Sequence, residues 1–422
     1  MNLSRIKQRA VLWSSILLLT LVATSSVLAQ DVAACLRIIA RSLAETGVNC
    51  ANNELGKACY ATGLIESVTE PDIDEETFDE PGENISLEEV ITLLPDTVDL
   101  VRETWGITVF NMQANLPTNF DRDVVVVVLG GAEMESDVDR DNRFQTLNAP
   151  ITVTTTSNSE LRAVTLSDPD DADVIGQVTS GILLPADAIS EDGDWARVIF
   201  QTLPAWISLT ALEGDTGSLP TYGRNNMTPF QSFFVRSGVK ASPCAQAPSL
   251  VLVQAPSEIP VDIIVNCVPI RIESTIVLRT QQNNAPTDTQ LEVITLFGMA
   301  TINADSDNPI YVPPGFSLPV GFDGNFVSLG IEGDEDEWGC TELSFGQPSL
   351  LTQQQISGLG IINRIPNNML NYVISLPRLV IPSGIGQVIR RLIFNNPQAL
   401  RIARRLCDAN ELPDNICDAL GL

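Results

Sequence analysis

The stretch Val124-Val125-Val126-Val127-Val128-Leu129 decides the fold class of this chain. Valine is β-branched and fits the pleated surface of a strand, and the run is too short for a helix of usual length. It is followed directly by Gly130-Gly131, a pair that favours a turn. The stretch therefore predicts a buried strand that ends at these two glycines.

Beyond this strand, short apolar runs continue along the chain. Phe230–Val235 is a strand-length run that is rich in phenylalanine. Between Ser249 and Phe322 the runs are Leu250–Val253, Val261–Val265, Ile270–Ile272, Thr275–Leu278, Leu291–Leu296 and Ala300–Ile302. Prolines separate them, at positions 256, 260, 286 and 309. This pattern predicts a β-rich, sandwich-like or stacked domain over residues 225–325.

Residues 148–213, between the two strands named first, form a separate module in this interpretation. Turn residues stand at Gly181 and at Asp192-Gly193-Asp194. The strand-like runs between them are Ile151–Thr155, Val174–Val178, Ile182–Leu184, Arg197–Phe200 and Trp206–Leu209. Short strands separated by regular turns are typical of a small barrel.

This module resembles the bacterial SH3-like (SH3b) family over about sixty residues, from 151 to 212. Leu161-Arg162-Ala163 corresponds to the N-V-R opening of that family, and Val174-Ile175-Gly176 precedes a paired strand. Asp192 to Val198 corresponds to its N-G-W-x-x-V segment, and Ala205-Trp206-Ile207 to its closing G-Y-V. Leu161 replaces the usual Asn, and Arg162-Ala163-Val164-Thr165 replaces the usual R-S-G-P loop.

The resemblance implies a recognition module, because many SH3b relatives bind cell-wall peptides or other extracellular ligands. It makes Arg162, Trp195 and Trp206 the candidate ligand-binding residues. A structural interpretation stays open for each. Trp195 and Trp206 would then belong to the barrel core, and Arg162 would pair with a carboxylate.

Two further resemblances are more limited. Leu291–Ile302, followed by Val312-Pro313-Pro314-Gly315, is similar to the strand pattern of FecR-like domains of envelope signalling, over about 290–320. Ala58-Cys59-Tyr60 and Asn111–Pro117 resemble stretches of exported proteins of Chloroflexi type. Neither resemblance implies an activity.

The N-terminal region, residues 30–147, is expected to be an α+β domain with an acidic linker. Asp31–Glu45 has helical apolar spacing, and Gly47 is expected to stop that helix. Residues 66–103 hold fourteen acidic residues and one arginine, so the part through Pro81-Gly82 is interpreted as a solvated linker. Asp137–Asp141 has half of a calcium-loop pattern without its later ligands, which favours an acidic surface turn.

The C-terminal region, residues 343–422, is Arg-rich and expected to be helical. Between Leu343 and Cys407 there are seven arginines and no acidic residue. Ile385–Phe394 and Gln398–Cys407 are predicted helices, separated by a proline. Residues 378–405 could contact a membrane surface, or dock on the acidic surface of the chain itself.

Residues 1–29 have the pattern of a secretory signal peptide. Arg5, Lys7 and Arg9 precede an uncharged run that ends in Val27-Leu28-Ala29, which predicts cleavage after Ala29. A retained membrane anchor and a lipidated cysteine are the alternatives. The sequence therefore predicts a secreted or cell-envelope protein.

Cysteine usage agrees with export. Eight cysteines, an even number, follow the predicted signal peptide: Cys35, Cys50, Cys59, Cys244, Cys267, Cys340, Cys407 and Cys417. Cys244–Cys267 and Cys407–Cys417 are the expected local disulfides, and the loop between Cys50 and Cys59 is expected to lie against the first helix. A zinc site is disfavoured, because the chain lacks both a C-x2-C motif and histidine.

Composition restricts the possible functions. The formal charge of −29, or −32 without residues 1–29, makes nucleic acid an improbable partner. With no histidine, Ser-His-Asp, Cys-His and HExxH chemistry are excluded, while carboxylate chemistry of the glycosidase type is not. No pattern indicates a cofactor or a metal.

The sequence thus predicts a non-catalytic protein that recognises a cell-wall or extracellular polymer or protein through its SH3-like module. A carboxylate-dependent polysaccharide hydrolase is the alternative from a different class. Envelope signalling, or association with a membrane surface through residues 378–405, is a third possibility.

Overall fold

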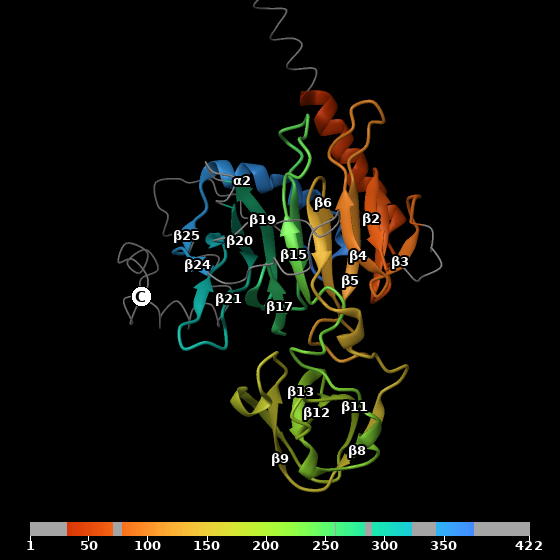
Figure 1. Ribbon diagram of the computed structural model, residues 1–422, viewed down its shortest axis with the longest axis vertical. Coiled ribbons are helices and arrows are strands. Elements are labelled where there is room, and N and C mark those ends of the chain that lie inside the picture. Colours follow the sequence, from red (N-terminus) through yellow and green to blue (C-terminus); the bar gives the residue numbers. More distant parts are fainter. Residues whose placement is uncertain (1–31, 71–77, 258, 283–288, 323–342, 375–422) are drawn as a thin grey trace, which may run out of the picture.

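The computed structural model describes residues 32–70, 78–257, 259–282, 289–322 and 343–374 of the 422-residue chain. Most of its elements are strands, and they form three sheets (Figure 1). The prediction of a mainly β protein is therefore confirmed. Among the described residues, no helix is long and apolar enough to cross a membrane.

Sheet A has ten strands. Nine follow the order β24-β23-β20-β19-β16-β6-β5-β1-β3, and β25 pairs with β23. Their bounds are β1 Lys57–Thr62, β3 Asn84–Ser86, β5 Ile107–Met112, β6 Val124–Leu129, β16 Leu250–Gln254, β19 Thr275–Gln282, β20 Thr289–Phe297, β23 Phe316–Phe322, β24 Leu343–Phe345 and β25 Ser349–Leu350.

Sheet B has eight strands in the order β2-β4-β7-β15-β17-β18-β21-β22. Strands β15 and β17 run parallel, and the other neighbours are antiparallel. The bounds are β2 Ile65–Thr69, β4 Val90–Pro95, β7 Glu133–Ser136, β15 Ser232–Arg236, β17 Val261–Val265, β18 Val268–Ile272, β21 Ala300–Ile302 and β22 Ile310–Val312.

Strand β6 shows why the valine run is uniformly apolar. Val124, Val126 and Val128 belong to a core that sheets A and B share. Val125 and Val127 point to the other face of sheet A and belong to a second core. Since successive side chains alternate between faces and both faces are covered, every position of this strand is buried, as the sequence predicted.

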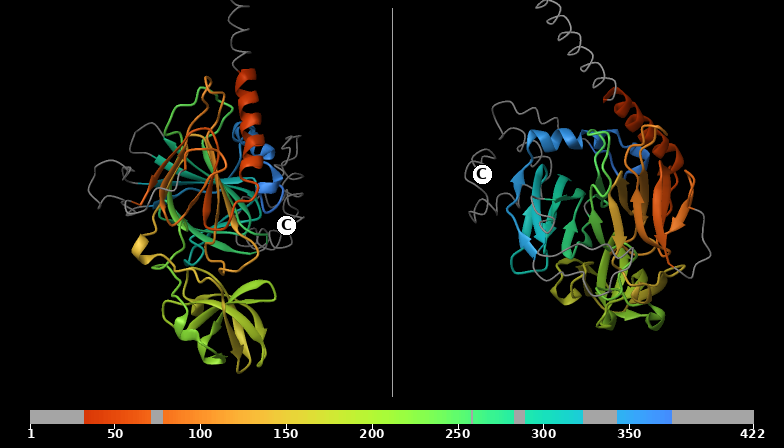
Figure 2. Two further views of the ribbon diagram at one scale, coloured as in Figure 1. Left: turned by 90° about the vertical axis from the view of Figure 1, so that its right-hand side faces the viewer. Right: turned by 45° about the horizontal axis from the view of Figure 1, so that its top comes forward.

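Helical segments cover this second face of sheet A (Figure 2, left). The helix over residues 32–49 buries Ile39 and Leu43 there. The same face also receives buried residues of the C-terminal elements α2 Gln353–Leu359, η5 Gly360–Arg364 and η6 Asn367–Met369. The expectation that Gly47 ends the first helix is wrong, because the helix continues to residue 49. A Cβ at Gly47 would lie 2.7 Å from Pro366, so this position needs glycine for close packing.

Two disulfides are described. Cys35 of the first helix bonds to Cys244, 209 residues away, and Cys50 bonds to Cys59. The expected Cys244–Cys267 pair is therefore wrong, because Cys244 already has a partner, although Cys267 is also disulfide-bonded. Disulfides of this kind are typical of proteins in an oxidising, extracellular environment.

The third sheet, here called the inserted sheet, has seven strands in the order β10-β9-β13-β12-β11-β8-β14. It lies between β7 and β15 in the sequence and below sheets A and B in Figure 1. Its strands are β8 Ile151–Thr155, β9 Ser159–Ala163, β10 Val174–Val178, β11 Leu183–Ile189, β12 Trp195–Phe200, β13 Leu203–Ser208 and β14 Leu212–Glu213. Short 3-10 helices flank or connect its strands: η1 Arg140–Asn142, η2 Pro169–Asp171, η3 Leu209–Ala211 and η4 Thr216–Ser218.

The segments before and after the inserted sheet share both large sheets. In sheet A, β6 pairs with β16, and in sheet B, β7 pairs with β15.

Within the acidic region, β2, β3 and β4 are ordered strands, so the solvated-linker interpretation is wrong for residues 66–69. The acidic turn at Asp137–Asp141 is exposed apart from Val138, as expected.

Several expectations lie outside the described residues. They include the signal peptide, the acidic cluster at 333–337, Cys340, the Cys407–Cys417 pair and the helices Ile385–Phe394 and Gln398–Cys407.

Candidate ligand-binding groove

A cavity of about 390 Å³ opens at one end of the inserted sheet. We call it the groove. Two loops form its walls, residues 164–173 between β9 and β10, and residues 190–194 between β11 and β12. Trp206 of β13 and the segment Tyr222-Gly223-Arg224 complete its lining. The groove thus combines the inserted sheet with residues that follow it in sequence.

The first loop is held in shape by Arg162. One terminal nitrogen of its guanidinium donates to the carbonyls of Asp170 at 2.7 Å and Ala172 at 3.1 Å. The side chain of Asp168 accepts from the Asp170 backbone N–H and caps the 3-10 turn that Pro169 begins. Arg162 is therefore bound to the backbone of the loop, and the loop carries Asp168 and Asp170.

The second loop is a tight turn. Asp192 accepts hydrogen bonds from the Ser190 hydroxyl and from the Asp194 backbone N–H. Gly193 has a φ of +79°, a conformation that favours glycine. These contacts fix the position of Asp192 at the groove.

The two candidate tryptophans have different roles in the structure. Trp195 is 9% exposed and lies under Arg162, whose guanidinium carbon is 5.3 Å from the ring centre. Trp206 is 2% exposed and lines the groove, and its Nε1 has no hydrogen-bond partner within the described part of the chain. Of the three residues predicted for ligand binding, only Trp206 lines the groove, while Arg162 and Trp195 support its wall.

Negative charge is concentrated at the rim of the groove. Carboxylate oxygens of Asp168, Asp170 and Asp192 all lie within 4.8 Å of one another, and the three side chains are exposed. None of them forms an ion pair with a described residue. Glu191 also lines the groove. The uncompensated charge favours a positively charged group at this rim.

A buried ion pair lies beside the groove, where the inserted sheet meets the large sheets. Arg197 and Asp187 form two parallel hydrogen bonds of 2.9 and 2.8 Å. The Arg197 guanidinium also lies 4.2 Å from the ring centre of Tyr222. Asp187 accepts from the backbone N–H and the hydroxyl of Thr118, a residue of the loop between β5 and β6 of sheet A. Burial raises the pKa of the Tyr222 hydroxyl well above its ordinary value.

The sequence did contain part of the signal for the groove. Asp192-Gly193-Asp194 was recognised as a turn, and Asp168-Pro169 has the pattern of a helix cap followed by proline. Tyr222 and Arg224 carried no such signal, because they reach the groove only through the path of the chain after β14.

Comparison of the chain with known protein families, with curated proteins and with solved structures finds no match.

Proposed function

We propose that this chain is a non-catalytic secreted or cell-envelope protein, and that its inserted sheet is an SH3-like module that recognises an extracellular ligand. The observation that carries the proposal is the groove between loops 164–173 and 190–194, with Trp206 in its lining. Two disulfides support the extracellular location.

The groove suits a ligand with a positively charged amino group. Asp168, Asp192 and Glu191 border it, and a charge-assisted hydrogen bond from an ammonium group to a carboxylate is stronger than a neutral one. Arg224 is exposed and lines the same groove, so it can bind a carboxylate of the ligand. Peptides of the cell wall carry both groups, which makes them the ligand class that fits best.

Co-sedimentation with purified cell-wall sacculi tests this function. The protein without residues 1–29 should be retained by the sacculi, and Asp168→Asn combined with Asp192→Asn should weaken retention about tenfold or more. Asparagine can keep the turn hydrogen bonds that each aspartate accepts, so the loops should stay folded.

The matched control combines Glu213→Gln, in β14, with Asp215→Asn, just after it, which removes two exposed charges that do not line the groove. This control should bind like the unchanged protein. Equal loss in both variants would indicate a general charge effect, and undiminished retention of the groove variant would refute the proposal.

Polysaccharide hydrolysis is a second candidate with a specific observation behind it. The clustered carboxylates of Asp168, Asp170 and Asp192 lie within 4.8 Å, and retaining glycosidases place two carboxyl groups about 5 Å apart. Release of reducing ends from wall glycans, lost in the Asp168→Asn and Asp192→Asn variant, would favour this function over recognition alone.

A further inference from the structure

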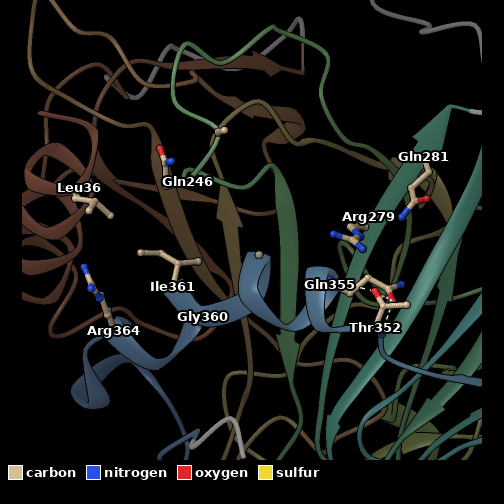
Figure 3. Close-up of a pocket in the computed structure, with 11 residues that line it drawn as sticks. Leu36, Gln246, Arg279, Gln281, Thr352, Gln355, Gly360, Ile361 and Arg364 are labelled. Carbon is tan, nitrogen blue, oxygen red and sulfur yellow. Dashed lines mark hydrogen bonds between the residues drawn. The ribbon is translucent and has the colours of Figure 1, made fainter. Parts of the chain in front are cut away.

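A second cavity, larger than the groove, lies between the helical segments that cover sheet A and the end of β19 (Figure 3). Its volume is about 990 Å³, at the upper end of the ~300–1,000 Å³ that ligand sites occupy. Four segments line it: the first helix, the loop after Cys244, β19, and residues 352–364.

Positive charge and amide groups distinguish this cavity. Arg279 and Arg364 line the cavity, and no lining residue is acidic, although the chain has a formal charge of −29. Figure 3 shows Arg279 beside Gln281 at one end and Arg364 beside Leu36 at the other. The cavity thus offers one guanidinium at each end.

Arg279 is held in a fixed orientation by Glu292. Its Nε lies 2.5 Å from Oε2 of Glu292, a side chain that is only 5% exposed. Gln281 donates to the same oxygen at 2.7 Å, and Gln355 donates to Oε1 at 2.5 Å. Both oxygens of Glu292 are therefore occupied. Among the described residues, no hydrogen bond uses the two terminal nitrogens of Arg279, so their N–H groups are available to a ligand.

Arg364 is also available to a ligand. It is exposed in the last turn of η5 and forms no ion pair with a described residue. Between the two arginines the wall is formed partly by Ile361, and Leu36 lines the end beside Arg364 (Figure 3). Aliphatic side chains of this kind pack against the C–H groups of a ligand, while Gln246 and Gln281 offer amide groups to its hydroxyls.

We propose that this cavity binds an acidic oligosaccharide, with one carboxylate at Arg279 and another at Arg364. A guanidinium presents two parallel N–H groups that match a carboxylate, and amides match sugar hydroxyls. A single carboxylate ligand would use one end only, whereas a chain of uronic acid residues carries a carboxylate on each sugar. The size of the cavity and the separated arginines together favour the repeated acid.

The disulfide Cys35–Cys244 stabilises this cavity. Leu36 and Ala245, which both line the cavity, directly follow the two bonded cysteines in sequence. The bond therefore fixes the first helix against the neighbouring loop in the cavity wall. Such fixing reduces the entropy that ligand binding would otherwise cost.

Calorimetric titration with trigalacturonate tests the proposal, with its fully methyl-esterified form as the neutral probe. The acid should bind at least tenfold more tightly than the ester. Arg364→Gln and Arg279→Lys should each weaken binding of the acid about tenfold. Lysine at 279 keeps a positive charge near Glu292 while it removes the guanidinium.

Arg37→Gln is the matched control, because Arg37 is an exposed arginine of the first helix that does not line the cavity. It should leave binding unchanged. Absence of binding, equal loss in the control, or equally tight binding of triglutamate would each overturn the proposal. The Asp168→Asn and Asp192→Asn variant should bind trigalacturonate normally, so this result is independent of the sacculus experiment.

Discussion

Arg197 and Asp187 form an ion pair in which the side chains are only 0% and 3% exposed. Burial removes both charged groups from water, which costs free energy. The hydrogen bonds and ring contacts of the two side chains offset this desolvation cost. Asp187 accepts two bonds from Arg197 and two from Thr118, while the guanidinium lies against the rings of Phe144 and Tyr222. Removal of one partner would leave the other charge buried and unpaired.

We expect Asp187→Asn to lower the free energy of unfolding by about 3–5 kcal/mol, the usual cost of breaking a buried pair. Denaturant titration followed by fluorescence measures this change. Glu45→Gln provides the comparison, because it breaks an exposed pair with Arg41 and should cost no more than about 0.5 kcal/mol. Similar effects of the two substitutions would contradict a structural role for the buried pair.

Glu135, unlike the stabilising pair of Arg197 and Asp187, lowers the stability of the fold at neutral pH. Burial, and then the neighbouring charge of Glu133, raise the pKa of Glu135 above its ordinary value of 4.5. The folded state then binds more protons than the unfolded state, so the stability from this group is present below the ordinary pKa. It is lost as the pH rises through the raised pKa of the folded state. At neutral pH the ionised side chain is therefore destabilising.

Glu135→Gln should accordingly raise the melting temperature at pH 7, and the gain should shrink as the pH approaches 4. Thermal unfolding followed by circular dichroism at both pH values measures the difference. Glu213→Gln, at an exposed position, should show no gain at either pH. A gain that is independent of pH would show that the charge of Glu135 is not the cause.

At the scale of elements, the sequence predicted strands best where β-branched residues are frequent. The predicted runs Ile151–Thr155, Val174–Val178 and Val261–Val265 have the same bounds as β8, β10 and β17. Strand β9, Ser159–Ala163, was missed, because it has no β-branched residue and three of its five residues are polar or charged. Strand β11 was predicted only at its start, since Pro185 and Asp187 conceal its buried positions.

The disulfide that joins the first helix to the loop at Cys244 should contribute more stability than the local one. A cross-link restricts the unfolded chain more when it closes a longer loop, and the separations are 209 and 9 residues. Replacement of Cys35 and Cys244 by Ser should therefore cost about 3 kcal/mol more than replacement of Cys50 and Cys59 by Ser. Denaturant titration of the two double variants measures the difference. Equal losses would contradict this loop-length argument.

At the scale of the whole molecule, the pairing of distant segments was beyond prediction from the sequence. Local rules favour short disulfide loops, so they selected Cys244–Cys267, whereas the fold brings Cys35 to Cys244. The same holds for the groove. Trp206 was predicted from a local motif, but Arg224 joins it only because the chain returns past loop 190–194 before β15. Periodicity indicates which residues are buried, and it contains no information on which segments meet.

The junction between the inserted sheet and the large sheets depends on Asn115, a fully buried side chain. Its amide nitrogen donates to the carbonyls of Val164 at 2.6 Å and Pro260 at 3.2 Å. Its oxygen accepts from the backbone N–H of Asp262 at 3.0 Å. Asp262 in turn accepts from the backbone N–H of Leu166 in the first groove loop. The Asn115 side chain thus connects the inserted sheet to the large sheets. The unfolding of the inserted sheet should therefore be coupled to the unfolding of the large sheets.

Asn115→Ala should cost about 1–3 kcal/mol, because it leaves buried backbone groups without partners. It should also separate one calorimetric transition into two, since the Asn115 side chain bonds to residues on both sides of the junction. Asn53→Ala is the matched control. Asn53 bonds only within sheet A and its flanking loop, to the carbonyls of Lys57 and Val109, so its loss should lower the melting temperature without splitting the transition. A single transition in Asn115→Ala would show that apolar packing is sufficient to couple the inserted sheet to the large sheets. Phe144, Trp206 and Tyr222 provide this packing at the junction.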